Sequence, residues 1–171
     1  MSYELIGFLI TVIFGSFLHF AFELSGYYTP VAIIAAVNES TWEHLKLGFL
    51  PILLWGIYEY FKLGFKNKNF VIAKATNMIA FCILVPVIFY SYVYILGKNF
   101  LILDISDFVI SVAVSQYLGY KIIKIKKDLK LDVLGYSLII ILMFLFIIFT
   151  FLPPQFVLFK DPITNSYGII K

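Results

Sequence analysis

The sequence predicts an all-α membrane protein whose helices form a single bundle. The chain of 171 residues is 62% hydrophobic and only 13% charged, with a mean hydropathy of +0.98, whereas a soluble domain is about half apolar. The apolar residues lie in runs of about 20 residues, the length that a helix needs to cross a bilayer. Helices are expected rather than a barrel, because the alternating pattern of barrel strands is absent and backbone groups in lipid must be satisfied internally.

Five membrane-spanning helices can be drawn, and we expect residues 1–171 to form one membrane domain. No basic region or cleavage site precedes the first span, so we interpret it as a retained helix and not as a signal peptide. The second span begins near Ser40, and the fifth ends where Pro153 and Pro154 prevent the helix from continuing. The predicted spans cover residues 4–23, 40–65, 69–95, 99–124 and 132–152, followed by an outer tail over 153–171.

A short apolar segment, PVAIIAAV at residues 30–37, lies between the first two spans, and its eight residues are too few to cross a bilayer. We therefore expect an interfacial segment or a re-entrant loop. A re-entrant loop would need cover from the rest of the protein or from a water-filled cavity.

Lysine positions predict how the bundle is oriented. Nine of the 13 basic residues fall in or next to two loops that lie on the same side of a five-span bundle, and positive residues favour the cytoplasmic side. The N-terminus is then inside and the C-terminus outside, as expected of a multi-pass protein of the cell membrane. The nine residues are Lys62, Lys66, Lys68 and Lys74 around the first of these loops, and Lys121, Lys124, Lys126, Lys127 and Lys130 around the second.

Composition also narrows the classes of partner. The net charge is +3, and no basic patch of the kind that binds nucleic acids is present. Cys82 is the only cysteine and lies in an apolar run, so we expect neither a disulfide framework nor redox chemistry. Membrane lipids are therefore the expected partners, and nucleic acids are not expected to bind.

Two sets of histidine and acidic residues are the strongest functional candidates. His19 and Glu23 are four residues apart and share one face of the first span. A similar set begins the second span, within the polar stretch NESTWEH at residues 38–44, and we expect the two sets to face each other. Imidazole and carboxylate groups bind zinc and similar divalent ions and also act as general acids and bases. The predicted ligands are His19, Glu23, Glu39, Glu43 and His44; His19, Glu23, Glu43 and His44 are also the candidate catalytic residues.

Part of this pattern has a purely structural interpretation as well. Ser40 and Glu43 have the spacing of a capping box, in which each side chain bonds a backbone amide at a helix start. Asn38 could cap the helix in place of Ser40, and Lys46 could pair with Glu43 one turn earlier. Capping does not account for His19, so both interpretations stay open.

A second polar group begins the fourth span. Asp104 and Asp107 lie there, and Ser111 and Ser115 continue the same face in steps of four residues. Such a stripe must face the bundle interior or a wet cavity, although the aspartates could instead lie in water at the helix end. The tail could fold over the site as a lid. The candidate members of this outer pocket are Asn38, Ser40, Lys46, Asp104, Asp107, Asp161 and Tyr167.

The opposite end of the bundle offers fewer polar residues. Lys74 is expected to extend to the lipid headgroups, and Asn77 is expected to hydrogen-bond to a neighbouring helix. The inner halves of the first, second and fifth spans look apolar, which argues against a polar path through the bundle.

Three motifs carry a resemblance to a known family: H-F-x-x-E in the first span, N-E-S-x-W-E-H-x-K at the start of the second, and D-P-x-T-x-x-Y-G in the tail. The chain resembles a family of small, uncharacterised bacterial membrane proteins, a resemblance that implies no activity. A single motif, a histidine and a glutamate four residues apart in a span, is similar to emopamil-binding sterol isomerases, but their last-span pattern of tryptophan and asparagine is absent. The matching residues are His19, Phe20, Glu23, Asn38, Glu39, Ser40, Trp42, Glu43, His44, Lys46, Asp161, Pro162, Thr164, Tyr167 and Gly168.

These observations predict an outward-facing pocket that binds a divalent metal ion, zinc or a similar ion, or a polar small ligand. The pocket could modify a lipid or isoprenoid within the membrane by acid–base or metal-assisted chemistry. Two alternatives remain: a subunit for small-molecule transport, and a structural or immunity-type protein in which the motif only fixes helix packing.

Overall fold

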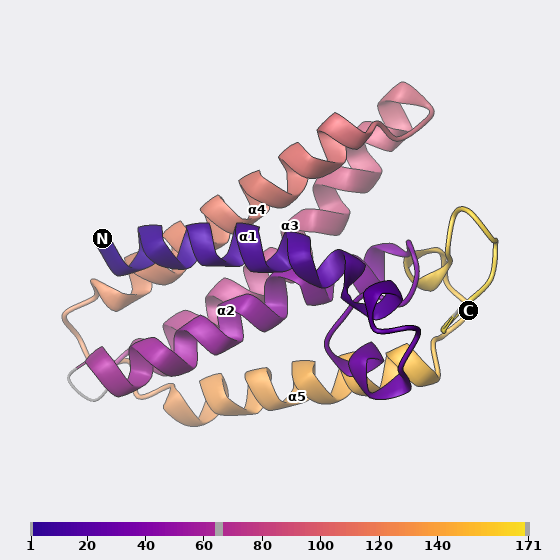
Figure 1. Cartoon of the computed structure of the whole chain (residues 1–171). Helices are drawn as coiled ribbons and strands as arrows, with labels where there is room; N and C mark the ends of the chain where they lie inside the picture. The colour runs from indigo at the N-terminus through magenta and orange to yellow at the C-terminus, as the bar shows by residue number, and fades with distance from the viewer. Residues whose placement is uncertain (1, 64–66, 170–171) are drawn as a thin grey trace.

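The computed structural model is an up-and-down bundle of five long helices in the part of the chain that it describes, residues 2–63 and 67–169 (Figure 1). An all-α fold is therefore confirmed. The short 3-10 helix η1 lies in the connection between the first two long helices, and η3 follows the last one. Their bounds are α1 (Ser2–Leu24), η1 (Thr29–Ile33), α2 (Thr41–Leu63), α3 (Phe70–Leu96), α4 (Leu101–Ile123), α5 (Asp132–Phe151) and η3 (Val157–Phe159).

The helix boundaries agree with the expected spans to within a few residues. Pro153 and Pro154 directly follow the last turn of α5 and its C-cap, as their missing amide hydrogens require. The predicted second span extended to residue 65, but the structure describes α2 only to Leu63. Residues 64 and 65, Lys66 and the last two residues of the tail lie outside the described residues.

Four of the five helices are long and apolar enough to cross a membrane: α1, α3, α4 and α5. The remaining helix, α2, is equally long but carries four charged side chains, those of Glu43, Lys46, Glu59 and Lys62. It packs against both α1 and α3, so much of its polar surface is enclosed by other helices. The fold thus supports a membrane protein, with α2 as its polar helix.

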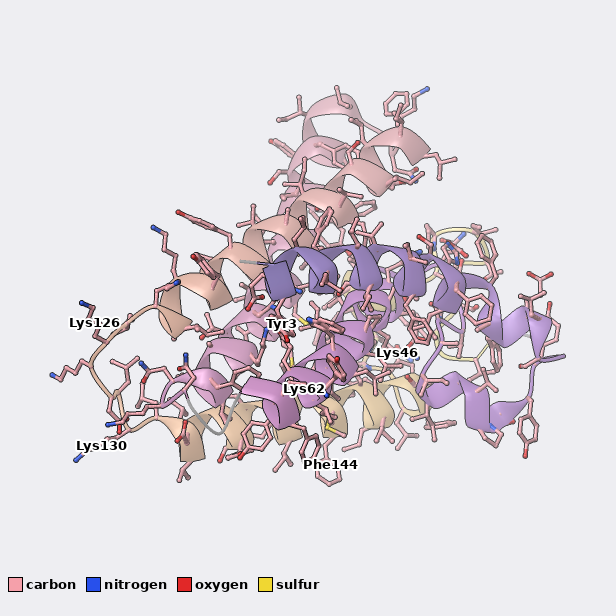
Figure 2. The ribbon with its side chains drawn as sticks, turned by 60° about the vertical axis from the view of Figure 1, so that its left-hand side comes forward. Tyr3, Lys46, Lys62, Lys126, Lys130 and Phe144 are labelled. Carbon is pink, nitrogen blue, oxygen red and sulfur yellow. The ribbon has the colours of Figure 1, made fainter. Side chains whose placement is uncertain are left out.

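The helices alternate in direction, so the connections separate into two groups (Figure 1). The start of α1 lies at one end with the end of α2, the start of α3 and the α4–α5 connection, and Figure 2 shows Lys126 and Lys130 projecting outward from this connection. The α1–α2 connection and the C-terminal tail lie at the other end. We call these the lysine-rich end and the tail end.

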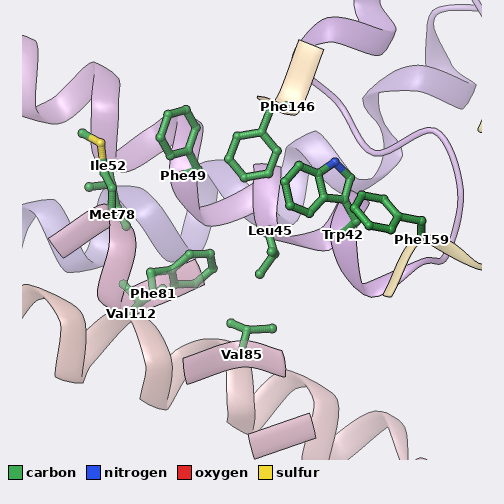
Figure 3. Close-up of a cluster of buried hydrophobic side chains, with 10 residues drawn as sticks. All are labelled: Trp42, Leu45, Phe49, Ile52, Met78, Phe81, Val85, Val112, Phe146 and Phe159. Atoms are coloured by element: carbon green, nitrogen blue, oxygen red, sulfur yellow. The ribbon is translucent and has the colours of Figure 1, made fainter. Parts of the chain in front are cut away.

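The hydrophobic core joins α2, α3, α4, α5 and η3 (Figure 3). The Trp42 ring lies with its centroid 4.8 Å from the Phe146 ring and 4.8 Å from the Phe159 ring. This aromatic contact attaches the start of α2 to both α5 and the tail, which positions the neighbouring polar residues. The buried members are Trp42, Leu45, Phe49, Ile52, Met78, Phe81, Val85, Val112, Phe146 and Phe159.

Two glycines allow unusually close helix contacts. A Cβ atom on Gly15 in α1 would lie 2.4 Å from the Leu47 carbonyl oxygen of α2, and one on Gly48 would lie 2.1 Å from the Phe81 ring. These distances are shorter than any side chain tolerates. Glycine at these positions therefore sets how closely α1 and α3 approach α2.

The apolar segment between α1 and α2 packs against protein. Ala32 and Ala35 are fully buried, and they form a small cluster with Phe22 of α1 and Val37. This enclosure holds the chain that leads into α2.

Candidate metal site

His19, Glu39 and His44 bring their side chains together at the tail end of the bundle. His19 comes from the last turns of α1, Glu39 from the connection, and His44 from the first turn of α2. The Oε2 atom of Glu39 lies 3.5 Å from Nε2 of His44 and 3.9 Å from Nε2 of His19. One ligand atom from each residue lies within 4.8 Å of the others. We call these three residues the histidine cluster.

The backbone fixes the orientation of the His44 ring. Its Nδ1 atom lies 2.9 Å from the carbonyl oxygen of Ser40, and because a carbonyl can only accept, Nδ1 must carry the proton. The lone pair is then on Nε2, the atom that faces Glu39. The His19 ring stacks on Phe20 and meets the His44 ring edge-on, with centroids 5.0 Å apart.

A compact turn places Glu39 beside the two histidines. The side chain of Asn38 accepts a hydrogen bond from the Ser40 amide, and the Ser40 hydroxyl accepts one from the Glu43 amide. This is half of the predicted capping box. The Glu43 carboxylate does not complete it, because it accepts a hydrogen bond from the Val37 amide instead.

The C-terminal tail returns to this turn and holds it. The Asn38 side chain donates to the Gly168 carbonyl oxygen at 2.7 Å, and the Glu39 amide donates to Asp161 at 3.2 Å. Asp161 also accepts hydrogen bonds from the amides of Ile163 and Thr164. Burial alone would raise the pKa of Asp161, but the amides of Thr164, Glu39 and Ile163 together hold it below its usual value.

The histidine cluster opens onto a cavity of about 440 Å³ between the tail ends of α1, α2, α3 and α4. Pro162 and Ile163 of the tail line part of its wall. Apolar side chains such as Val12, Leu47 and Phe108 form much of the lining, and polar groups are added by the cluster and by two aspartates. The cavity therefore combines an apolar wall with an acidic, imidazole-bearing end.

The two aspartates have different surroundings. Asp104 accepts hydrogen bonds from the Tyr92 hydroxyl and from the side chain of Asn99, which tie it to the α3–α4 hairpin. Asp107 is 3% exposed and accepts a hydrogen bond from the Ser111 hydroxyl. Ser111 and Ser115 are fully buried, as expected for a stripe that faces the bundle interior.

Glu23 and Glu43, both predicted ligands, lie apart from the histidine cluster. Glu23 shares a helix with His19, but it lies in the last turn of α1 and is exposed. Glu43 is 2% exposed and forms an ion pair with Lys46, whose ammonium also donates to Ala32 and Thr150. The structural alternative therefore applies to Glu43 and Lys46, whereas Glu39 is the carboxylate that joins the histidines.

The remaining predicted pocket residues have supporting positions. Tyr167 packs against the hydrophobic core, and its backbone forms an isolated β-bridge with Lys160 that closes the tail into a loop. Asn99, Phe108 and Ile163 also line the cavity but were not predicted as pocket residues. No motif marks them, because an apolar or amide side chain becomes a pocket wall only through packing.

The lysine-rich end contains a second buried polar group that was not expected. Lys74 does not extend to the headgroups as predicted: it is 4% exposed and pairs with Glu59 of α2 and with Glu4 of α1. Asn77 donates a hydrogen bond to Gln116 of α4, which confirms its predicted interhelical role. The prediction of an apolar inner half is therefore wrong for α1 and α2.

The donor atoms of the histidine cluster suit a zinc-like ion. Two imidazole nitrogens and one carboxylate oxygen are the ligand type of catalytic zinc sites, which keep a fourth position open. In a tetrahedral site with bonds of about 2.0 to 2.1 Å, ligand atoms lie about 3.3 Å apart. The 3.5 and 3.9 Å separations around Glu39 lie near that value, and all three ligand atoms lie within 4.8 Å of one another.

Comparisons with known proteins give a family and no function. The model of a family of unknown function, DUF6512, matches residues 2–169. No curated protein and no solved structure matches the chain.

Proposed function

Because the chain belongs to the family of unknown function DUF6512, its function has to be argued from its own geometry, and we propose that it binds a divalent metal ion at His19, Glu39 and His44. The observation that carries this proposal is the convergence of three donor atoms within 4.8 Å from three separate segments. The carbonyl of Ser40 supports it by fixing the His44 tautomer, as outer-shell partners of metal ligands do.

The charge of the cavity favours a cation. Three carboxyl groups, those of Glu39, Asp104 and Asp107, line it together with the two histidines, and no lysine is among its described lining residues. Imidazole nitrogen as a ligand favours zinc and its neighbours over calcium or magnesium, which prefer oxygen ligands.

The apolar wall suggests an amphiphilic ligand or substrate. A lipid or isoprenoid could place its polar group at the histidine cluster and its chain along Val12, Leu47 and Phe108. A bound zinc ion would supply Lewis acidity or an activated water. Asp107, buried on the same cavity, is then better placed than Glu23 or Glu43 to exchange a proton with the substrate.

The membrane topology forms part of the proposal. All five long helices would cross the cell membrane, with the lysine-rich end in the cytoplasm and the tail end outside. The polar side chains of α2 do not prevent this, since Glu43 and Lys46 compensate each other within the bundle. The segment of η1 would lie at the outer interface or re-enter the bilayer, covered by α1.

Metal binding by matched glutamine variants tests the proposal. Protein purified without chelator should contain about one zinc or similar ion per chain, measured by elemental analysis. Glu39→Gln removes a charged ligand and should weaken zinc affinity at least tenfold in titration calorimetry. Glu23→Gln, one turn beyond His19 and exposed, should bind zinc as the unmodified protein does.

The double variant His19→Ala with His44→Ala separates the site from the structural alternative. A folded double variant of unchanged thermal stability that has lost the ion supports the metal site. A metal-free unmodified protein, or a double variant that only loses stability, supports a role in helix packing. Mass spectrometry of co-purified lipids would then identify the occupant of the cavity.

A transport role is the second candidate. Buried polar residues continue from Asp107 toward the lysine-rich end. Transport requires such a polar path through the bundle.

A further inference from the structure

Glu4, Glu59 and Lys74 form a buried charged triad near the lysine-rich end. Lys74 pairs with Glu59 and lies 3.2 Å from a carboxylate oxygen of Glu4, and the side chains of Lys74 and Glu59 are 4% and 2% exposed. Two carboxylates share one ammonium, so the triad carries one negative charge when all three groups are ionised.

A layer of unpartnered polar atoms lies one turn above the triad. Asn77 follows Lys74 by three residues on α3, and Trp55 precedes Glu59 by four on α2. Within the described residues, buried polar atoms without a hydrogen-bond partner include Oδ1 of Asn77 and Nε2 of Gln116, and Thr11 of α1 adds its hydroxyl, while the Trp55 side chain interacts with the Glu59 carboxylate. Each such atom costs about 1 to 3 kcal/mol if it stays unsatisfied.

Gly7 shows that these atoms converge on one region. A Cβ atom on Gly7 would lie 2.6 Å from Nε1 of Trp55 and 3.0 Å from Nε2 of Gln116. The side chain of Asn77 is already bonded to Gln116 at 2.8 Å. Side chains from α1, α2, α3 and α4 therefore surround a common polar region in the bundle interior.

Helix α4 connects this layer to the histidine cavity. Gln116 adjoins Ser115, and Ser115, Ser111 and Asp107 follow one face of α4 in steps of four residues, all of them buried. The nine residue-to-residue steps from Asp107 to Gln116 span about 14 Å at the rise of an α-helix. Asp107 lines the cavity itself, so polar side chains extend from the cavity to the triad.

We infer that this line of residues, from Asp107 through Gln116 and Asn77 to Glu59, conducts protons between the histidine cavity and the lysine-rich end. A proton binds the Asp107 carboxylate from the cavity. Water molecules that hydrogen-bond to the unpartnered atoms carry it past Gln116 and Asn77, and the Glu59 carboxylate accepts it. Glu59 passes the proton to Glu4, whose side chain is 13% exposed, and Glu4 releases it at the lysine-rich end.

Two features favour this role over simple packing. Ionisable residues inside a membrane bundle are expensive and mark proton relays and ion pathways. In addition, the fully satisfied pair of Glu43 and Lys46 shows that the same bundle can bury charge without unpartnered atoms. The inference does not depend on metal binding, because neither the triad nor the unpartnered layer includes a metal ligand.

Proton flux into liposomes tests the inference. Purified protein is reconstituted into vesicles that contain a pH-sensitive dye, a pH gradient is imposed in the presence of chelator, and valinomycin with potassium compensates the charge. Flux should exceed that of protein-free vesicles, and Glu59→Gln and Gln116→Leu should each lower the excess at least tenfold. Thr150→Val, fully buried in α5 away from this line, should conduct as the unmodified protein does.

Either variant can decide the result if the other fails to fold. Thermal stability in detergent identifies variants that are folded. Flux no greater than in protein-free vesicles, or equal flux in a folded Gln116→Leu or Glu59→Gln variant, would overturn the inference. Loss of flux in Thr150→Val would also overturn it, because the effect would then be unrelated to the line of polar residues. Each outcome of the flux assay is independent of whether the protein binds zinc.

Discussion

Asp161 links the docking of the tail to pH. Three backbone amides hold its folded pKa below the unfolded value of 3.8, so the carboxylate stabilises the docked tail above that pH. This contribution is lost as the pH falls through the folded pKa. The amide resonances of Glu39 and Thr164, both bonded to Asp161, should therefore shift together below about pH 3.8 in NMR spectra.

The variant Asp161→Asn is the control for this titration. Asparagine keeps one acceptor oxygen but has no charge to lose, so the acid shift should be absent while the fold persists. Amides that titrate unchanged in Asp161→Asn would show that another group controls the tail.

Single residues also show what the sequence could and could not predict at the site. The motifs identified both histidines, because imidazoles in an apolar chain are rare and conspicuous. They did not identify which carboxylate joins them. Glu23 shares a helix face with His19 and looked like its partner, but it lies in the last turn of α1 with its side chain exposed. Glu39 reaches the cluster only through the turn at Asn38, which depends on contacts with the tail 130 residues away.

At the scale of helices, Gly15 controls the distance between the two histidines. Gly15 lies one turn before His19 on α1. The Leu47 carbonyl that it faces belongs to the residue three positions after His44 on α2. Gly15→Ala must push α1 away from α2, because backbone cannot yield as a flexible side chain does. We expect zinc affinity to fall about tenfold, or about 1.4 kcal/mol, in titration calorimetry.

Gly56→Ala provides the matched control. Its Cβ atom would meet the Lys74 side chain at 3.6 Å, an ordinary contact, so the zinc affinity should not change. If Gly15→Ala binds zinc with unchanged affinity, helix spacing does not set the geometry of the histidine cluster.

The helices themselves were predictable because hydropathy and proline mark their limits. The role of α2 was harder to predict from the sequence. Its charged residues resemble those of a helix end in contact with water, yet Glu43, Lys46 and Glu59 are buried. Their partners on other elements come from the η1 segment, α3 and α5, and pairing between helices depends on rotation about each axis, which a single sequence does not specify.

For the whole molecule, the distribution of lysines predicts which end faces the cytoplasm. In a Cys82→Ala background, Lys98→Cys lies in the α3–α4 connection and Lys126→Cys in the α4–α5 connection. A membrane-impermeant maleimide added to intact cells should label Lys98→Cys. It should label Lys126→Cys only after the membrane is permeabilised.

The opposite labelling pattern would place the histidine cavity on the cytoplasmic side. Labelling of both positions in intact cells would contradict five crossings, since the two connections must lie on opposite faces. Either result would revise the topology while leaving the geometry of the cavity unchanged.

The contacts of Gly168 with Asn38 and of Asp161 with Glu39 set an order of events during biogenesis. The ribosome makes the turn that carries Glu39 early and the segment that braces it late, after every helix has been synthesised. In the proposed topology, that segment must also be translocated before it can reach the turn. A nascent or prematurely terminated chain would hold both histidines but no firmly held carboxylate, so the cell would complete this site only as the protein matures.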